Sequence, residues 1–127
     1  MKLPHDLKYA PTHEWARLET DGTLTVGITD HAQAELGDII FAGDVKPGAH
    51  LAAGQVAGVV ESVKTASDIH APVDGEIIAF NTALENEPQG INERPYEHWI
   101  FRMRPARTAD VERLLDHAGY AAAAGQD

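Results

Sequence analysis

Apolar and polar residues alternate along much of this chain, in the period-two pattern of half-buried β-strands. The pattern is clearest over 15–19 and 23–28, and Asp21-Gly22 between them is a typical hairpin turn, so we expect these two strands to pair. Further strands, the first of them buried, are predicted at 38–42, 55–63, 67–71, 76–80 and 98–104. Short strands separated by Gly- and Pro-containing turns predict a mainly β sandwich or barrel with short peripheral helices.

Two short helices are predicted at the edges of this β-fold. Asp30 is a favourable N-cap residue, Gln33 stands at the capping-box position, and Gly37 is a typical helix end. Thr108 is expected to cap a C-terminal helix. The apolar face of that helix would be formed by Val111, Leu114 and Leu115.

The remaining segments are predicted to be irregular. Residues 81–94 are polar and rich in turn formers, which favours a long surface loop, and 121–127 are expected to form a frayed tail. With 127 residues, the chain is predicted to be a single domain spanning 1–127, with its core between about 7 and 120.

Composition narrows the classes of partner and chemistry. The net charge of −10 makes nucleic acid and anionic membranes poor partners and favours proteins with basic docking surfaces. No apolar stretch approaches the ~20 residues of a membrane span, and the N-terminus lacks the apolar core of a signal peptide. The chain has no cysteine, so any thiol chemistry must come from an attached group.

Lys64 is the most informative candidate residue. It stands between the longest β-branched run, which ends at Val63, and the short apolar segment 67–71. Because burying an ammonium group is costly, a lysine between two strands is expected at an exposed hairpin tip. Its neighbours Ser62 and Thr65 are small, so a modifying enzyme could reach the amine.

Motifs along most of the chain resemble the glycine cleavage system H protein family. The segment from Glu61 to Ile69, followed by Ala71-Pro72-Val73-Asp74-Gly75, is similar to the lipoylation segment of that family. Further resemblances lie at 13–15, 27–33, 36–39, 59–62, 91–92, 95–96 and 99, and the similarity runs from about 7 to 120. Several motifs in register make the resemblance specific.

This resemblance implies a barrel-sandwich hybrid fold like that of biotinyl and lipoyl carriers, and lipoic acid in amide linkage to Lys64. The implied protein is a non-catalytic monomeric carrier, cytoplasmic in a bacterium or in the mitochondrial matrix after removal of a transit peptide. Its arm would take the aminomethyl group of glycine from a pyridoxal-phosphate glycine decarboxylase to a tetrahydrofolate-dependent aminomethyltransferase. A flavin-containing (FAD) dihydrolipoamide dehydrogenase would reoxidise the arm, and a lipoate-attaching enzyme would install it.

The resemblance also implies a cleft in which the loaded arm rests. Glu14 and Asp68 occupy the positions that contact the arm in this family, and Thr12 occupies a neighbouring position in its lining. The chemistry is reasonable, because a carboxylate can hold a cationic amine by a charge-assisted hydrogen bond. His13 and His70 stand near these residues, and the sequence leaves open whether either touches the arm.

Other functions are less well supported by the residues. A biotin carrier normally has methionines beside its lysine, whereas Val63 and Thr65 stand here. No hydrolase triad or metal-binding histidine pattern is visible among the seven histidines. Departures from the family pattern at 42–48 and 94–99 leave a second alternative, an H-like protein that relays lipoate or serves another lipoyl-dependent system.

Overall fold

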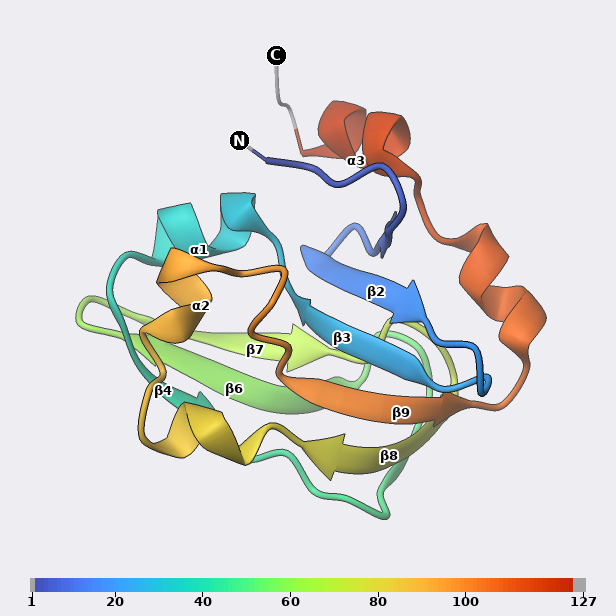
Figure 1. Ribbon diagram of the computed structural model, residues 1–127, viewed down its shortest axis with the longest axis horizontal. Coiled ribbons are helices and arrows are strands. Elements are labelled where there is room, and N and C mark those ends of the chain that lie inside the picture. Colours follow the sequence, from blue (N-terminus) through green and yellow to red (C-terminus); the bar gives the residue numbers. More distant parts are fainter. Residues whose placement is uncertain (1, 125–127) are drawn as a thin grey trace.

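The computed structural model describes residues 2–124, and its strands form two sheets (Figure 1). The larger sheet has the strand order β1-β2-β3-β9-β8-β5, and the smaller has the order β4-β6-β7. The strands of the larger sheet are β1 (Lys8–Tyr9), β2 (Glu14–Leu18), β3 (Leu24–Ile28), β9 (Phe101–Pro105), β8 (Gly75–Phe80) and β5 (His50–Leu51). Those of the smaller sheet are β4 (Ile39–Gly43), β6 (Val56–Ser62) and β7 (Ala66–His70).

The predicted pairing of the first two long strands is confirmed. β2 and β3 are antiparallel, with Trp15 opposite Gly27. A Cβ atom at Gly27 would lie only 2.6 Å from Nε1 of Trp15, so the indole packs directly on the glycine backbone. The same Nε1 donates a 3.0 Å hydrogen bond to the carbonyl of Pro95. Trp15 therefore holds the segment around Pro95 against the β2–β3 hairpin.

The smaller sheet contains the predicted hairpin around Lys64. β6 and β7 pair antiparallel and β4 covers the other edge of β6. The prediction that 38–42 is a fully buried strand is wrong in part, because the side chains of Ile40 and Phe41 are exposed. A bulge between Ile39 and Phe41 interrupts the register and with it the alternation of buried and exposed positions.

Helix α1 (Asp30–Leu36) forms where predicted, but its cap is a different residue. Thr29 is the N-cap, since its backbone is extended and its Oγ1 accepts a 3.2 Å hydrogen bond from the amide of Ala32. Asp30 lies inside the first turn, where its carboxylate accepts instead from the side-chain amide of Gln33. Gly37 ends the helix, as predicted.

The segment 81–94 is not the long surface loop that its polarity predicts. It contains a 3-10 helix, η1 (Thr82–Glu85), and a short helix, α2 (Gly90–Glu93). Two isolated apolar side chains, Leu84 and Ile91, are fully buried in the core and explain the ordered turns. They are too far apart in sequence to produce a recognisable apolar period.

The C-terminal helix is displaced from its predicted position. Thr108 begins a 3-10 helix, η2 (Thr108–Arg113), and caps nothing, because Arg107 precedes it as N-cap without a side-chain bond. The α-helix α3 (His117–Ala123) starts later and is capped by Asp116. Residues 121–123, predicted to be frayed, are helical, and 125–127 lie outside the described residues.

The core has two parts. The main cluster lies between the two sheets and includes side chains from both, such as Val26 and Ile77 in one and Val60 and Ile69 in the other. A second cluster joins the chain ends and consists of Leu7, Tyr9, Trp15 and Tyr120. None of the helices within 2–124 is long and apolar enough to cross a membrane.

Candidate functional site

Lys64 lies at the exposed tip of the β6–β7 hairpin, as the sequence predicts. The backbone of this turn is held by one side chain. Ser62 Oγ accepts hydrogen bonds from the amides of Lys64 and Thr65, at 3.3 and 3.1 Å, and the amide of Ser62 donates to the carbonyl of Thr65 at 2.7 Å. The turn is thus ordered while its lysine faces solvent.

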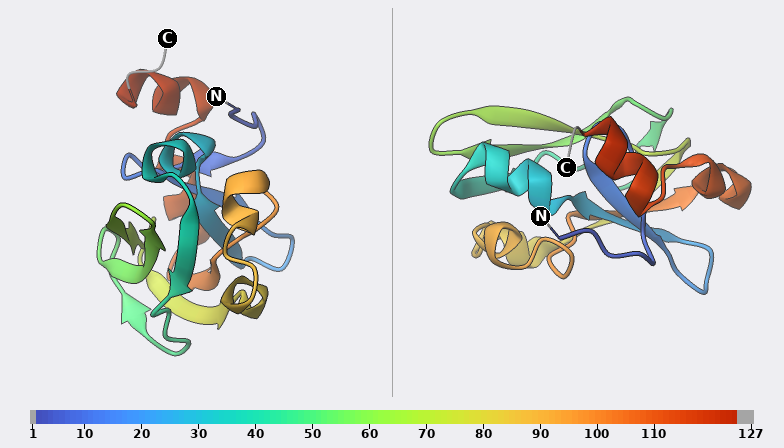
Figure 2. Two further views of the ribbon diagram at one scale, coloured as in Figure 1. Left: turned by 90° about the vertical axis from the view of Figure 1, so that its left-hand side faces the viewer. Right: turned by 90° about the horizontal axis from the view of Figure 1, so that it is seen from above.

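Two contacts fix the tip to the rest of the molecule. The amide of Val63 donates a 3.0 Å hydrogen bond to the carbonyl of Asp38, at the start of β4. The stem of Lys64 packs over Gly37, where a Cβ atom would lie 3.4 Å from its Cε. Gly37 has a φ of 82°, a left-handed conformation that favours glycine. The end of α1 therefore lies directly beside the lysine, and Figure 2 shows the hairpin running alongside that helix.

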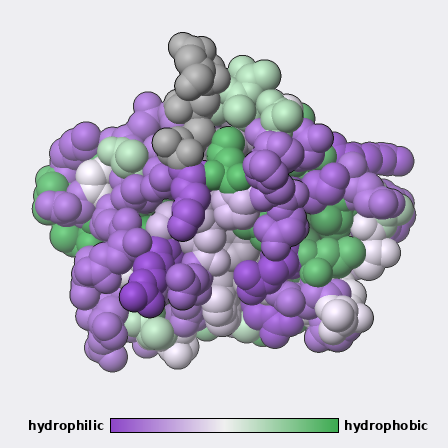
Figure 3. Space-filling model, turned by 45° about the horizontal axis from the view of Figure 1, so that its top comes forward, coloured by the Kyte–Doolittle hydropathy of each residue, from purple (hydrophilic) through white to green (hydrophobic). Residues whose placement is uncertain are grey.

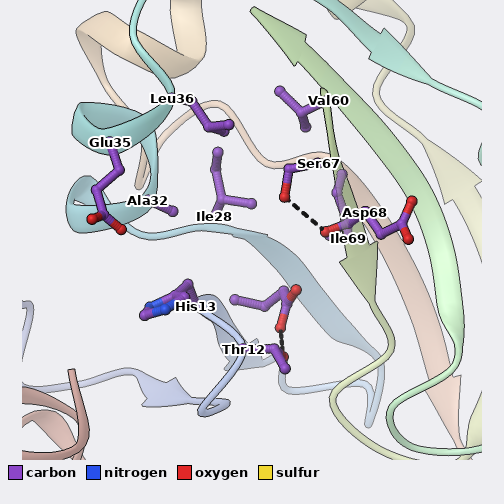
Figure 4. A pocket seen from close by; sticks show the side chains of 11 residues that line it. Thr12, His13, Ile28, Ala32, Glu35, Leu36, Val60, Ser67, Asp68 and Ile69 are labelled. Carbon is purple, nitrogen blue, oxygen red and sulfur yellow. Dashed lines mark hydrogen bonds between the residues drawn. The ribbon is translucent and has the colours of Figure 1, made fainter. Parts of the chain in front are cut away.

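A cavity of about 150 Å³ opens between α1, β2 and β7 (Figure 4). One wall is apolar, and the other carries polar and acidic side chains. The apolar wall is formed by Ile28, Ala32, Leu36, Val60 and Ile69. The polar wall is formed by Thr12, His13, Glu14, Glu35, Ser67 and Asp68. This arrangement suits an aliphatic chain that ends in a cation.

Glu14 is the buried carboxylate of the cavity, with 1% of its surface exposed. Its Oε1 accepts a short hydrogen bond from the hydroxyl of Thr12, and its Oε2 accepts a 2.9 Å bond from the backbone amide of His70. Burial raises the pKa of Glu14, and the hydrogen bonds from Thr12 and His70 oppose that rise. Because few donors face this buried carboxylate, it can accept a further hydrogen bond.

The three residues predicted to line a cleft all border this cavity. Thr12 lies in the turn that precedes β2, Glu14 begins β2, and Asp68 comes from β7 with its side chain exposed at the rim. The sequence interpretation missed Glu35, a further carboxylate of the lining on α1. Glu35 stands three residues after Ala32, the i,i+3 spacing that places two side chains on one helix face, and this spacing could have indicated it.

The two histidines left open by the sequence have different positions. His70 pairs with Glu14, with 3.4 Å between Nδ1 and Oε2, and does not line the cavity. His13 lines the cavity, and its Nδ1 lies 2.6 Å from the hydroxyl of Tyr120. Among residues 2–124, no group of three or more His, Asp or Glu side chains could hold a metal ion.

Lys64 and the cavity lie on the same hairpin. Lys64 precedes Asp68 by four residues, so their backbones are at most ~13 Å apart at ~3.3 Å per residue. Leu36, which lines the cavity, is the neighbour of Gly37 beneath the lysine stem. A long acyl chain on the lysine would therefore have a continuous path from the tip, past the end of α1, into the apolar wall.

Comparisons with known proteins give a consistent answer. The sequence matches the family model described as "Glycine cleavage H-protein" over residues 7–127. It is 61% identical to the glycine cleavage system H protein of Bordetella pertussis over 125 residues, 98% of this chain and 100% of the relative. It is 55% identical to glycine cleavage system H protein 2 of Pseudomonas aeruginosa over 121 residues, 95% of this chain and 94% of that one.

A solved structure shares the fold. The crystal structure of a glycine cleavage system H protein from Mycobacterium marinum matches with a TM-score of 0.86 and 36% identity, covering 97% of this chain and 99% of that one. The two sheets and short helices agree with the barrel-sandwich hybrid predicted from the sequence. That prediction of fold class is confirmed.

Proposed function

Because the chain belongs to the glycine cleavage H-protein family, whose members are non-catalytic lipoyl carriers, we propose that Lys64 carries lipoic acid in amide linkage. The observation that supports the proposal most directly is the ordered hairpin tip with an exposed lysine beside an acidic, apolar-backed cavity. Acylation removes the lysine charge and adds the dithiolane that the cysteine-free chain lacks.

The attached group supplies the chemistry, accepting the aminomethyl group at glycine decarboxylase, giving it up at the aminomethyltransferase and being reoxidised by dihydrolipoamide dehydrogenase. The residues of the chain have a different task. Between visits, the apolar wall of Ile28, Leu36 and Ile69 would shield the aliphatic part of the arm from water. Glu14 and Asp68 would hold the cationic amine at its end, with Thr12 orienting the Glu14 carboxylate.

We place these encounters in the bacterial cytoplasm, since the similar relatives are bacterial. The two segments that depart from the family pattern, 42–48 and 94–99, contribute no residue to the cavity lining. This favours a cleft that works as in the rest of the family. The lipoate-relay alternative concerns only the partners that the arm visits.

The attachment site is tested by intact mass. We expect protein from lipoate-replete cells to carry one lipoyl increment that is lost completely in Lys64→Arg. Lys46→Arg is the matched control, because Lys46 is exposed but lies outside the hairpin, and it should keep the increment. A biotin increment, or no increment in the presence of a competent ligase, would overturn the proposal.

The carrier role is tested separately, with purified glycine decarboxylase and lipoylated protein. Exchange of labelled bicarbonate into glycine should depend on the lipoylated chain and should be absent with Lys64→Arg. If the lipoylated chain does not support exchange but donates lipoate to other acceptors, the relay function replaces the carrier function.

A further inference from the structure

A buried hydrogen-bonded chain connects the C-terminal helix to the wall of the cavity. Tyr120, on α3, is fully buried, and its hydroxyl lies 2.6 Å from Nδ1 of His13 and 2.8 Å from Oγ1 of Thr29. Thr29 is also fully buried, and its Oγ1 already accepts from the amide of Ala32. The chain therefore ends at a histidine that lines the cavity.

The number of protons fixes the direction of these bonds. Thr29 has a single hydroxyl proton, and within residues 2–124 the only oxygen bonded to it is that of Tyr120. If Thr29 donates to Tyr120, then Tyr120 donates to Nδ1 of His13 and every proton is used. In the reverse direction the hydroxyl proton of Thr29 would be buried without an acceptor, which is costly. The favoured order is Ala32 to Thr29 to Tyr120 to His13.

We infer that Tyr120 is a positioning residue for the arm cavity: its buried hydroxyl donates to Nδ1 of His13 and holds this wall residue as the neutral imidazole with its proton on Nε2. The inference rests on the proposed function only for its consequence, the retention of a cationic amine. The hydrogen-bond order itself is a property of the unmodified chain.

The groups around His13 act on its protonation in opposite directions. It faces His31 and Glu35 on α1, Glu14 on β2, Tyr120 on α3 and Asp68 across the cavity on β7, and His70 stands beside Glu14 outside the lining. The nearby carboxylates favour the imidazolium form, whereas a donor at Nδ1 requires a lone pair there. The pKa of His13 is lowered by burial and by His31, against the influence of Glu35, and burial raises the pKa of Tyr120 so that it stays a donor.

The neutral state matters for what the cavity can hold. An imidazolium at His13 would repel a cationic amine and would compete with it for the carboxylates of Glu14 and Glu35. A neutral His13 adds no further cation beside these carboxylates, which already lie against His70 and His31. Tyr120 thereby acts on the bound group through His13 although it does not line the cavity.

The hydrogen-bond order can be measured on the unlipoylated full-length chain. Two-bond ¹H–¹⁵N correlation spectra of the imidazoles, between about pH 5 and 8, report both tautomer and protonation. We expect His13, identified by loss of its signals in His13→Gln, to be the Nε2-protonated tautomer and to resist protonation. A wild-type His13 with its proton on Nδ1 would overturn the inference.

Two phenylalanine variants make a matched pair. In Tyr120→Phe, His13 should titrate nearer to 6.5 and populate both tautomers. Tyr9→Phe removes another buried hydroxyl, one that donates to the carbonyl of Pro4 at 2.6 Å, and its ring stacks on Tyr120 at 5.0 Å. This control should leave the His13 signals as in the wild type. An unchanged His13 in Tyr120→Phe would contradict the inference.

Retention of the aminomethyl group provides the functional readout. The lipoylated proteins are loaded, and the loss of the amine is followed at pH 6 and pH 7.5. Relative to the wild type at each pH, Tyr120→Phe should lose it several-fold faster at pH 6 than at pH 7.5, while Tyr9→Phe should show no such difference. Equal losses at both pH values would mean a merely structural role. If the chain cannot be lipoylated, the proposed function fails but the tautomer result still stands.

Discussion

At the scale of single residues, Glu14 is a buried carboxylate that the folded protein tolerates and that can still accept a further hydrogen bond from a ligand. It is buried among Thr12, His70 and apolar side chains, and its burial raises its pKa. The charge is therefore costly in the empty cavity. A cationic amine that reaches it would relieve this cost, which gives the loaded arm a preference over a neutral one.

This cost predicts the pH dependence of stability. A pKa raised above its ordinary value of 4.5 means that the folded state binds a proton that the unfolded state has lost. Stability from this group is present below pH 4.5 and declines as pH rises through the folded pKa, by about 1.4 kcal/mol per pKa unit. In Glu14→Gln this decline should be absent, as measured by urea unfolding across that range.

The acid limit is the internal control for this experiment. Below pH 4.5 both proteins are uncharged at position 14, so any difference there reflects altered hydrogen bonds to Thr12 and His70. The free energies of unfolding should then converge or cross as pH rises. A Glu14→Gln variant that falls further behind the wild type toward neutral pH would show that the pKa of Glu14 is lowered instead.

At the scale of elements, the β6–β7 hairpin presents its lysine in a defined place because its turn is tied on both sides. Ser62 holds the turn from within, and the Val63–Asp38 hydrogen bond holds it to the start of β4. Val63 and Ile40 are exposed beside it, at 69% and 56%, and green side chains mark this end of the molecule in Figure 3. A modifying enzyme would thus find a rigid turn with an apolar margin.

Removing the hydroxyl in Ser62→Ala should loosen the turn more than it destabilises the protein. The amides of Lys64 and Thr65 would lose their acceptor, so their hydrogen exchange should accelerate several-fold and lipoylation should slow. The unfolding free energy should fall by only ~1 kcal/mol, because Lys64 and Thr65 are exposed and their amides can bond to water instead.

Thr20→Ala is the matched control for this change, because Thr20 is an exposed hydroxyl in the turn between β2 and β3. It should leave exchange at 64 and 65 and the rate of lipoylation unchanged. If Ser62→Ala is lipoylated at the wild-type rate, then order in the turn is not what the attaching enzyme requires.

At the same scale, the sequence predicted the elements that are specified by residues close together in the chain. It missed the features that depend on contacts between distant residues. The β2–β3 hairpin and the lysine turn are specified by local alternation and turn residues, and both are confirmed. The helix cap was assigned to Asp30 rather than Thr29 because both residue types are good caps. The Tyr120–His13 pair joins residues 107 positions apart, which no local pattern could indicate.

At the scale of the whole molecule, charge is unevenly distributed. The arginines Arg102, Arg107 and Arg113 make their ion pairs around β9 and η2, whereas the hairpin tip has Glu61, Asp38 and Asp68 near it. In Figure 1 these regions lie at opposite ends, right and left. Acylation of Lys64 removes the cation at the tip and sharpens this difference. Partners that dock at the tip are therefore expected to present basic surfaces.

This asymmetry predicts salt-sensitive docking. Association of the lipoylated chain with glycine decarboxylase should slow markedly between 0.1 M and 1 M salt, because the Debye length shortens from about 10 Å to about 3 Å. Stopped-flow or biosensor measurements at several salt concentrations would give the slope. Rates independent of salt would contradict an electrostatic role for the acidic end.

The location of the effect can be tested with two exposed glutamates. Glu61→Gln, on β6 near the tip, should lower the association rate and flatten its salt dependence, whereas Glu112→Gln, in η2 at the far end, should change neither. Equal effects of the two would mean that only net charge matters.

The hydrogen bond from Tyr120 to His13 has a consequence for the order in which the lysine turn and the cavity form during synthesis. On the ribosome, β2, α1 and the lysine hairpin emerge well before α3, the last helix within residues 2–124. The turn that an attaching enzyme would recognise can therefore form before the histidine in the cavity wall has acquired its hydrogen-bond donor. The turn that carries the lysine can therefore form early in synthesis, but the wall of the cavity is complete only when α3 docks.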